Sequence, residues 1–219
     1  MIACAKTLSY GLWQHPCMPR LQPIYLELGQ KWVFACALDW PGWCRRGKDE
    51  EAAVQALLAY AQRYRAVAGS GFPVSDVEIV GHLEGNATTD FGAPSAIGPW
   101  DEEPLGGQDA RRQLAVLEAS WRAFDEIAGG APSELRKGPR GGGRDRDGIA
   151  RHVQEAERSY AAKVGARVPP RTPWKDQRTS LVDALSSPAG EPKWPVRYAL
   201  RRIAWHVLDH AWEIEDRSS

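Results

Sequence analysis

The sequence predicts an α+β protein, with a small β-sheet covered by one helix in its first part and an antiparallel four-helix bundle in its second. The prediction depends on a change of period along the chain. Apolar and polar side chains alternate in several segments of residues 22–82, whereas apolar side chains recur every three or four positions within residues 108–219. Residues 83–107 separate the two patterns and are rich in glycine and proline, so we expect a linker there.

Residues 1–21 are expected to be a flexible tail because they show neither period. They contain no basic region followed by an apolar core, so no signal peptide is expected. Met18 stands just before the first strand-like segment, and either Met1 or Met18 could be the start of the protein.

A β-hairpin is expected at the beginning of the sheet. Residues 24–28 alternate apolar and polar side chains, residues 31–38 form a second strand, and residues 29–30 supply a two-residue turn. Residues 41–42, proline and glycine, mark the next turn, and the W-C-R-R that follows predicts a short third strand.

One amphipathic helix is expected over residues 48–68. Asp49 is its predicted N-cap, and the acids that follow suit the positive end of the helix dipole. Residues 74–80 alternate again and should return the chain to the sheet, which gives the element order ββ(β)αβ.

These segments carry a resemblance to a known family. D-W-P-G-W-C-R-R-G followed by D-E-E-A-A resembles the HicB-like domain pattern, in which an aspartate–proline–glycine turn precedes a glycine and a helix opening with E-E-A. The resemblance covers residues 22–82 and implies a small sheet with one covering helix. The best-known role in that family is an antitoxin that caps a ribonuclease partner. No separate DNA-binding segment is evident, so a reused scaffold is the alternative.

Four helices are expected in the second part, over residues 108–128, 145–164, 174–186 and 195–216. The lengths of their connections favour an antiparallel bundle. In the linker before them, Phe91, Ile97 and Trp100 suggest packing against the rest of the protein.

The last of these helices carries His206 and His210, which lie one turn apart on the same face. A divalent ion needs a third ligand, and His152 lies inside another helix of the bundle. Three neutral imidazoles leave coordination positions open for water or substrate, which is typical of catalytic sites. Val207 stands where the H-E-x-x-H protease motif needs an acid, so that motif is absent. Ordinary buried histidines are the alternative.

This constellation resembles the DinB-like (YfiT-like) superfamily of four-helix-bundle metalloproteins, in which a histidine on the second helix joins an H-x-x-x-H motif on the fourth. His152 in R-D-G-I-A-R-H-V-Q-E-A-E, and His206 with His210 in W-H-V-L-D-H-A-W-E-I-E-D-R, occupy these positions. The resemblance implies one divalent metal ion, which is zinc, nickel or iron across the family. It also implies transfer of a low-molecular-weight thiol cosubstrate, or a thiol-dependent isomerisation, and bundles that pair as homodimers.

Charged residues around the histidines are further candidates. Glu213 shares the face of the two histidines on its helix, so as a catalytic residue it could orient a histidine, act as a base or become a fourth ligand. Arg202, four residues before His206, is the second catalytic candidate and could pair with Glu213 or an anionic substrate. Asp209 and Glu155 are candidates for supporting the ligands, with solvent exposure or an ion pair between helices as the alternative.

A glycine–arginine loop precedes the helix that carries His152. It contains no G-K-[ST], so it is not a P-loop. Its backbone N–H groups and guanidinium groups could hold an anionic substrate group at the positive end of the following helix. The residues concerned are Arg140, Gly141, Gly142, Gly143 and Arg144. A solvated connection is the alternative.

Composition excludes several other classes of protein. The 28 basic and 28 acidic residues give zero net charge, which argues against a nucleic-acid partner. No apolar run approaches the roughly 20 residues of a membrane helix. No C-x-x-C pair occurs among the four cysteines, Cys4, Cys17, Cys36 and Cys44. We therefore expect reduced thiols in a cytoplasmic protein, and a Cys36–Cys44 disulfide is the alternative.

These features together predict a divalent-metal-dependent transferase or hydrolase that acts on a small-molecule substrate, without membrane or nucleic-acid partners. The metal would lower the pKa of a bound thiol or water, and the sequence does not separate thiol transfer from hydrolysis. The alternative is a binding or regulatory protein that acts through a protein partner without catalysis.

Overall fold

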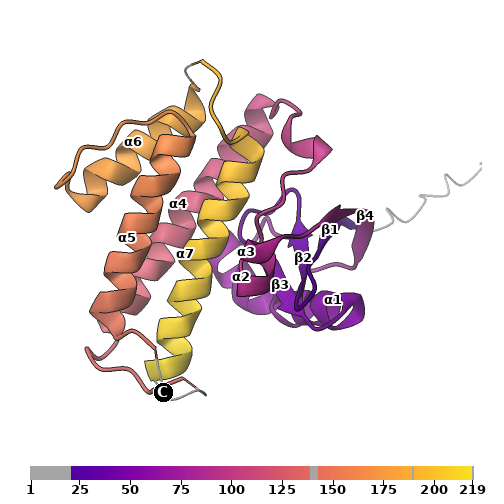
Figure 1. The fold of residues 1–219 in the computed structure, drawn as a ribbon, viewed down its shortest axis with the longest axis horizontal. Coiled ribbons are helices and arrows are strands. Elements are labelled where there is room, and N and C mark those ends of the chain that lie inside the picture. The colour runs from indigo at the N-terminus through magenta and orange to yellow at the C-terminus, as the bar shows by residue number, and fades with distance from the viewer. Residues whose placement is uncertain (1–20, 139–142, 189, 219) are drawn as a thin grey trace, which may run out of the picture.

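The computed structural model describes residues 21–138, 143–188 and 190–218. Over these residues the chain is a mixed α+β protein, with a four-stranded sheet in its first part and seven α-helices that lie mostly in its second part (Figure 1). The predicted α+β class is therefore confirmed at this level.

The sheet contains β1 (Gln22–Leu28), β2 (Val33–Ala37), β3 (Cys44–Gly47) and β4 (Val77–Glu84). Its strand order is β3-β2-β1-β4. β2 pairs antiparallel with both β1 and β3, whereas β4 pairs parallel with β1. The predicted hairpin, short third strand and returning fourth strand are confirmed. The turn of the hairpin lies one residue later than predicted, at residues 30–31, because the Gly29 N–H donates to the Trp32 carbonyl at 2.9 Å.

The helical segment that follows β3 is broken in two, α1 (Glu50–Ala59) and α2 (Ala61–Ala68). The prediction of one helix is therefore wrong, whereas the predicted cap is confirmed: the Asp49 side chain accepts a hydrogen bond from the Ala52 N–H at 2.8 Å. The break falls at Tyr60, whose ring lies 3.5 Å from the Arg45 guanidinium carbon and 5.3 Å from the Trp212 ring. These tertiary contacts are invisible to the helical period.

Both faces of β1 and β2 are buried, because alternate residues of these two strands enter different clusters, whereas β4 is largely exposed. Ile24 and Leu26 pack toward α1, against Leu57 and its neighbours. Tyr25 and Phe34 belong to the opposite face, where Trp205 of the last helix completes the cluster. The second part of the chain therefore reaches both clusters, through Trp205 on this face and through Leu208 and Trp212 in the cluster with α1.

The glycine- and proline-rich connection contains α3 (Ala87–Phe91) and the short 3-10 helix η1 (Pro99–Asp101). Trp100 packs against Tyr25, with ring centroids 5.3 Å apart, as expected. The expectation is wrong for Phe91 and Ile97, which are 89% and 42% exposed. Polar contacts hold the segment instead, because the buried Glu27 carboxylate accepts hydrogen bonds from the N–H groups of residues 95 and 96.

Four longer helices form the second part: α4 (Gly107–Gly130), α5 (Arg146–Lys163), α6 (Trp174–Ser186) and α7 (Val196–Ser218). They share one apolar core and lie close to the bounds that the period predicts. Arg197, at the start of α7, donates to the carbonyl of Glu103, which precedes α4. Arg217, at the end of α7, donates to the carbonyl of Arg136, which follows α4. α4 and α7 therefore run in the same direction. α5 runs against them (Figure 1). Neighbouring helices therefore do not all alternate in direction as the predicted antiparallel bundle requires.

Helix α7 joins the two parts of the protein. Its Ile203 and Val207 lie in the core of the helices, whereas Leu208 and Trp212 lie in the cluster that contains the sheet and α1. A helix that is buried on almost every side leaves little freedom for its polar side chains. The predicted domain boundary at residue 107 stays a prediction. None of the described helices has the length and apolarity that crossing a membrane requires.

Candidate metal centre

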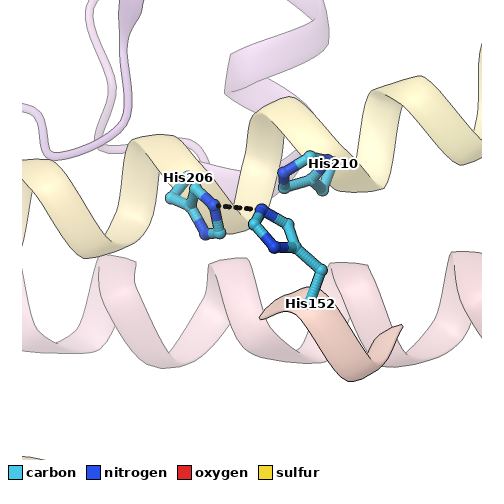
Figure 2. Close-up of side chains that lie close together, drawn as sticks. All are labelled: His152, His206 and His210. Carbon is cyan, nitrogen blue, oxygen red and sulfur yellow. Dashed lines mark hydrogen bonds between the residues drawn. The ribbon is translucent and has the colours of Figure 1, made fainter. Parts of the chain in front are cut away.

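Three histidines meet between α5 and α7. His206 and His210 project from successive turns of α7, and His152 reaches them from α5, as Figure 2 shows. One ring nitrogen from each histidine lies within 4.8 Å of the others. The Nε2 atoms of His152 and His206 are 3.2 Å apart. The structure thus brings together the three residues that the sequence predicts as ligands.

The separation of two of the three rings suits a divalent ion. Two nitrogen ligands of a tetrahedral zinc ion lie about 3.4 Å apart when each is about 2.0–2.1 Å from the metal. The observed 3.2 Å between His152 and His206 is close to that separation. His206 is only 6% exposed, and its buried Nδ1 has no hydrogen-bond partner among the described residues.

The surroundings of His152 and His206 favour their neutral forms, and the neutral imidazole is the form that binds metal. Burial lowers the pKa of His206 well below its ordinary value, and the positive charges of neighbouring His210 and Arg202 lower it further. The pKa of His152 is lowered too, first by burial and then by His210 and Arg144. Their ring lone pairs are therefore available near neutral pH.

Glu213 orients one of the three histidines. Its Oε2 lies 2.8 Å from Nδ1 of His210, and its Oε1 accepts a hydrogen bond of 2.8 Å from the Arg217 guanidinium. Burial opposes ionisation of Glu213, but the contacts with His210 and Arg217 outweigh it and lower its pKa. An ionised Glu213 can only accept, so His210 donates from Nδ1 and keeps its Nε2 lone pair for a ligand.

We expect Glu213→Gln to weaken metal binding by about 10-fold or more, because outer contacts of this kind typically change metal affinity by 10- to 100-fold. Glutamine still accepts a hydrogen bond but removes the charge between His210 and Arg217. Titration against a chromophoric zinc chelator measures the affinity. Glu215→Gln is the matched control, since Glu215 is a half-exposed acid on the same helix that pairs with Arg63. Equal losses in the two variants would contradict the role of Glu213.

The other charged candidates have other contacts or are exposed. The guanidinium carbon of Arg202 is 4.8 Å from the Trp205 ring centroid, and the contacts of Glu213 do not include it. Asp209 accepts a hydrogen bond of 3.1 Å from Arg45, so it forms an ion pair with the sheet part. Glu155 is exposed. The ion pair of Asp209 and the exposure of Glu155 agree with the alternatives to a role in supporting the histidines.

Only part of the glycine–arginine loop can be placed. Arg140, Gly141 and Gly142 lie outside the described residues. Gly143 has φ +126° and leaves no room for a side chain, because a Cβ there would lie 2.8 Å from the Arg217 guanidinium. The Arg144 carbonyl accepts a hydrogen bond of 2.8 Å from the same guanidinium. The loop thus joins the end of α7 near Glu213, and its role as an anion cradle stays a prediction.

Arg217 and Tyr160 are site residues that the sequence did not indicate. Arg217 contacts Glu213 and the loop backbone. Its position four residues after Glu213 is a signal that could have found it. The Tyr160 ring lies 5.7 Å from the His206 ring, at a right angle to it. No local signal indicates that contact, because it depends on how α5 meets α7.

The metal-free protein should lose stability in acid. Below the ordinary histidine pKa of 6.5, the unfolded chain binds a proton that folded His206 does not. The stability contributed by the neutral ring is complete above that pH and is lost as the pH falls toward the folded pKa, by up to about 1.4 kcal/mol per pH unit. Urea denaturation of chelated protein at several pH values measures this slope. If the His206→Ala variant shows the same slope of stability against pH, the slope does not come from His206.

Comparisons of the chain with protein-family models, with curated proteins and with solved structures gave no match.

Proposed function

We propose that the protein is a divalent-metal-dependent enzyme of the DinB-like type, with His152, His206 and His210 as its metal ligands. The observation that carries the proposal is the convergence of three imidazoles, one of them almost fully buried, from two helices. The proposal includes a HicB-like fold for the sheet part and a cytoplasmic enzyme that works as a homodimer.

Each residue of the centre has a part in the proposed chemistry. A bound zinc, nickel or iron ion supplies Lewis acidity, which lowers the pKa of a low-molecular-weight thiol or of water. His152 and His206 present neutral rings because burial disfavours their charged forms. Glu213 holds the His210 tautomer. Three protein ligands leave room for a substrate, as in catalytic zinc sites. Thiol transfer and hydrolysis both suit this arrangement.

Elemental analysis of protein purified without a histidine tag tests the proposal. We expect about one divalent ion per chain and a lower unfolding temperature after chelation, since a ligand present at about 1,000 times its Kd stabilises the folded state by about 4 kcal/mol. Metal-free protein whose unfolding temperature does not change on chelation would overturn the proposal. A loaded protein that neither consumes thiols with electrophilic acceptors nor hydrolyses esters and amides would overturn its enzymatic part.

The alternative is a regulatory protein that acts through a protein partner, and one surface feature favours it. Phe91 is 89% exposed beside a groove that Trp32 and three basic side chains also line. Aromatic side chains and arginine are enriched at protein interfaces. Under this alternative the purified chain contains no stoichiometric metal, so the same elemental analysis separates the two functions.

A further inference from the structure

Two cysteines face each other across the edge of the sheet. Cys36 of β2 and Cys44 of β3 are register partners, and their Sγ atoms are 2.8 Å apart. Both are free thiols, 3% and 6% exposed. The thiols therefore already lie side by side, on neighbouring strands that β-sheet hydrogen bonds hold in register.

The type of strand pair suits a disulfide bond between Cys36 and Cys44. The next pair along the ladder is hydrogen-bonded, because Ala37 N donates to the Trp43 carbonyl at 3.0 Å. Hydrogen-bonded and non-hydrogen-bonded pairs alternate in an antiparallel ladder, so Cys36 and Cys44 form a non-hydrogen-bonded pair. Side chains are closest in such pairs, with Cα atoms about 4.5 Å apart, which lies within the range that disulfides span.

A small cavity gives access to both sulfurs. It has a volume of about 20 Å³ and is lined by Cys36 and Cys44 together with Tyr198, Arg202 and Trp205, among others. A single water molecule needs about 10–15 Å³. The cavity therefore admits a reagent little larger than water and excludes a tripeptide disulfide.

We propose that Cys36 and Cys44 are a redox site, which hydrogen peroxide converts to a reversible intrachain disulfide. One thiolate attacks a peroxide oxygen and forms a sulfenic acid, with release of water. The second sulfur then displaces the hydroxyl group as another water, and the S–S bond forms. Two thiols are oxidised and one peroxide is reduced, which gives one disulfide and two waters.

The reaction should be slow at neutral pH. Burial raises the pKa of the Cys44 thiol, and the hydrogen bond with Cys36 raises it further. Since the thiolate is the nucleophile, the rate should rise with pH. The site does not depend on the proposed metal chemistry, although Trp205, which precedes His206, lies in the same cluster as both cysteines.

Peptide mass spectrometry tests the proposal on the full chain. Trypsin cleavage after Lys31 and Arg45 releases residues 32–45, which contain both cysteines and no others. After treatment of the folded protein with peroxide, we expect this peptide to be two hydrogens lighter and to take no alkylating agent. Dithiothreitol should restore two alkylatable thiols. Oxidised glutathione should act far more slowly than peroxide.

The experiment is best done with Cys4→Ser and Cys17→Ser in place, which prevents exchange with the other two thiols. Cys36→Ser in that background is the matched control and should give no cross-link. Two outcomes would overturn the proposal. One is a peptide that still accepts two alkyl groups or gains only oxygen atoms. The other is a disulfide that forms only after unfolding in denaturant.

Discussion

Replacing His206 with alanine is expected to remove metal from the protein. Structural zinc sites with four ligands bind with about 10–16 kcal/mol in total, so one ligand accounts for roughly 3 kcal/mol. Because 1.4 kcal/mol corresponds to a factor of ten, affinity should fall by at least about 100-fold. Elemental analysis after dialysis should then find little or no metal. The chelator should no longer change the unfolding temperature, because no bound ion is left to release.

His206 is buried, so the alanine variant could fail to fold for reasons unrelated to metal. His210→Ala is therefore the second variant, since His210 lies less deeply in the protein. His82→Ala is the control, because His82 is exposed on β4 and pairs with Glu50. A stoichiometric ion in folded His206→Ala and His210→Ala would show that the ligands lie elsewhere.

The second large effect is expected at a buried ion pair that does not include the histidines. Arg201 of α7 forms a two-pronged contact with Asp101 of η1, with N–O distances of 2.6 and 2.9 Å. The two residues are 7% and 2% exposed, and Asp101 also accepts from Gly98 N at 2.9 Å. Asp101→Ala leaves a buried, unpaired guanidinium. It should lower the free energy of unfolding by about 3–5 kcal/mol, measured by urea denaturation.

Two controls separate the ion pair from a general effect of substitution. Glu102→Ala changes an exposed neighbour and should alter stability by less than about 0.5 kcal/mol. Asp101→Leu combined with Arg201→Met replaces both charges by apolar groups, and it should recover much of the loss. A loss below about 1 kcal/mol in Asp101→Ala would show that water or another group already compensates Arg201.

The meeting of the three histidines could be predicted because helical spacing is a local property. His206 and His210 must share a face in any α-helix, whatever surrounds it. His152 required one further step, the expectation that two helices of a bundle bring their histidines together. Glu213 was predictable on the same stripe, but its three candidate roles were not separable. Its contacts with His210 and Arg217 depend on the burial and charge around the site.

Other features depended on contacts between residues far apart in the chain. The break at Tyr60 coincides with Arg45 and Trp212, and no residue next to Tyr60 signals it. Phe91 was expected to pack because it is apolar, yet the connection is fastened by the buried carboxylate of Glu27. A buried acid that holds backbone N–H groups cannot be distinguished from a surface acid by its sequence.

The sequence by itself determined the α+β class, the positions of most strands and helices, and the identity of the three histidines, because periodicity and spacing act over a few residues. Only the tertiary structure decided that α4 and α7 run in the same direction, that α7 is shared by both parts, and that Asp209 faces Arg45. It also set Cys36 against Cys44. The physical reason is that which faces meet depends on burying all apolar surfaces at once, which no local pattern encodes.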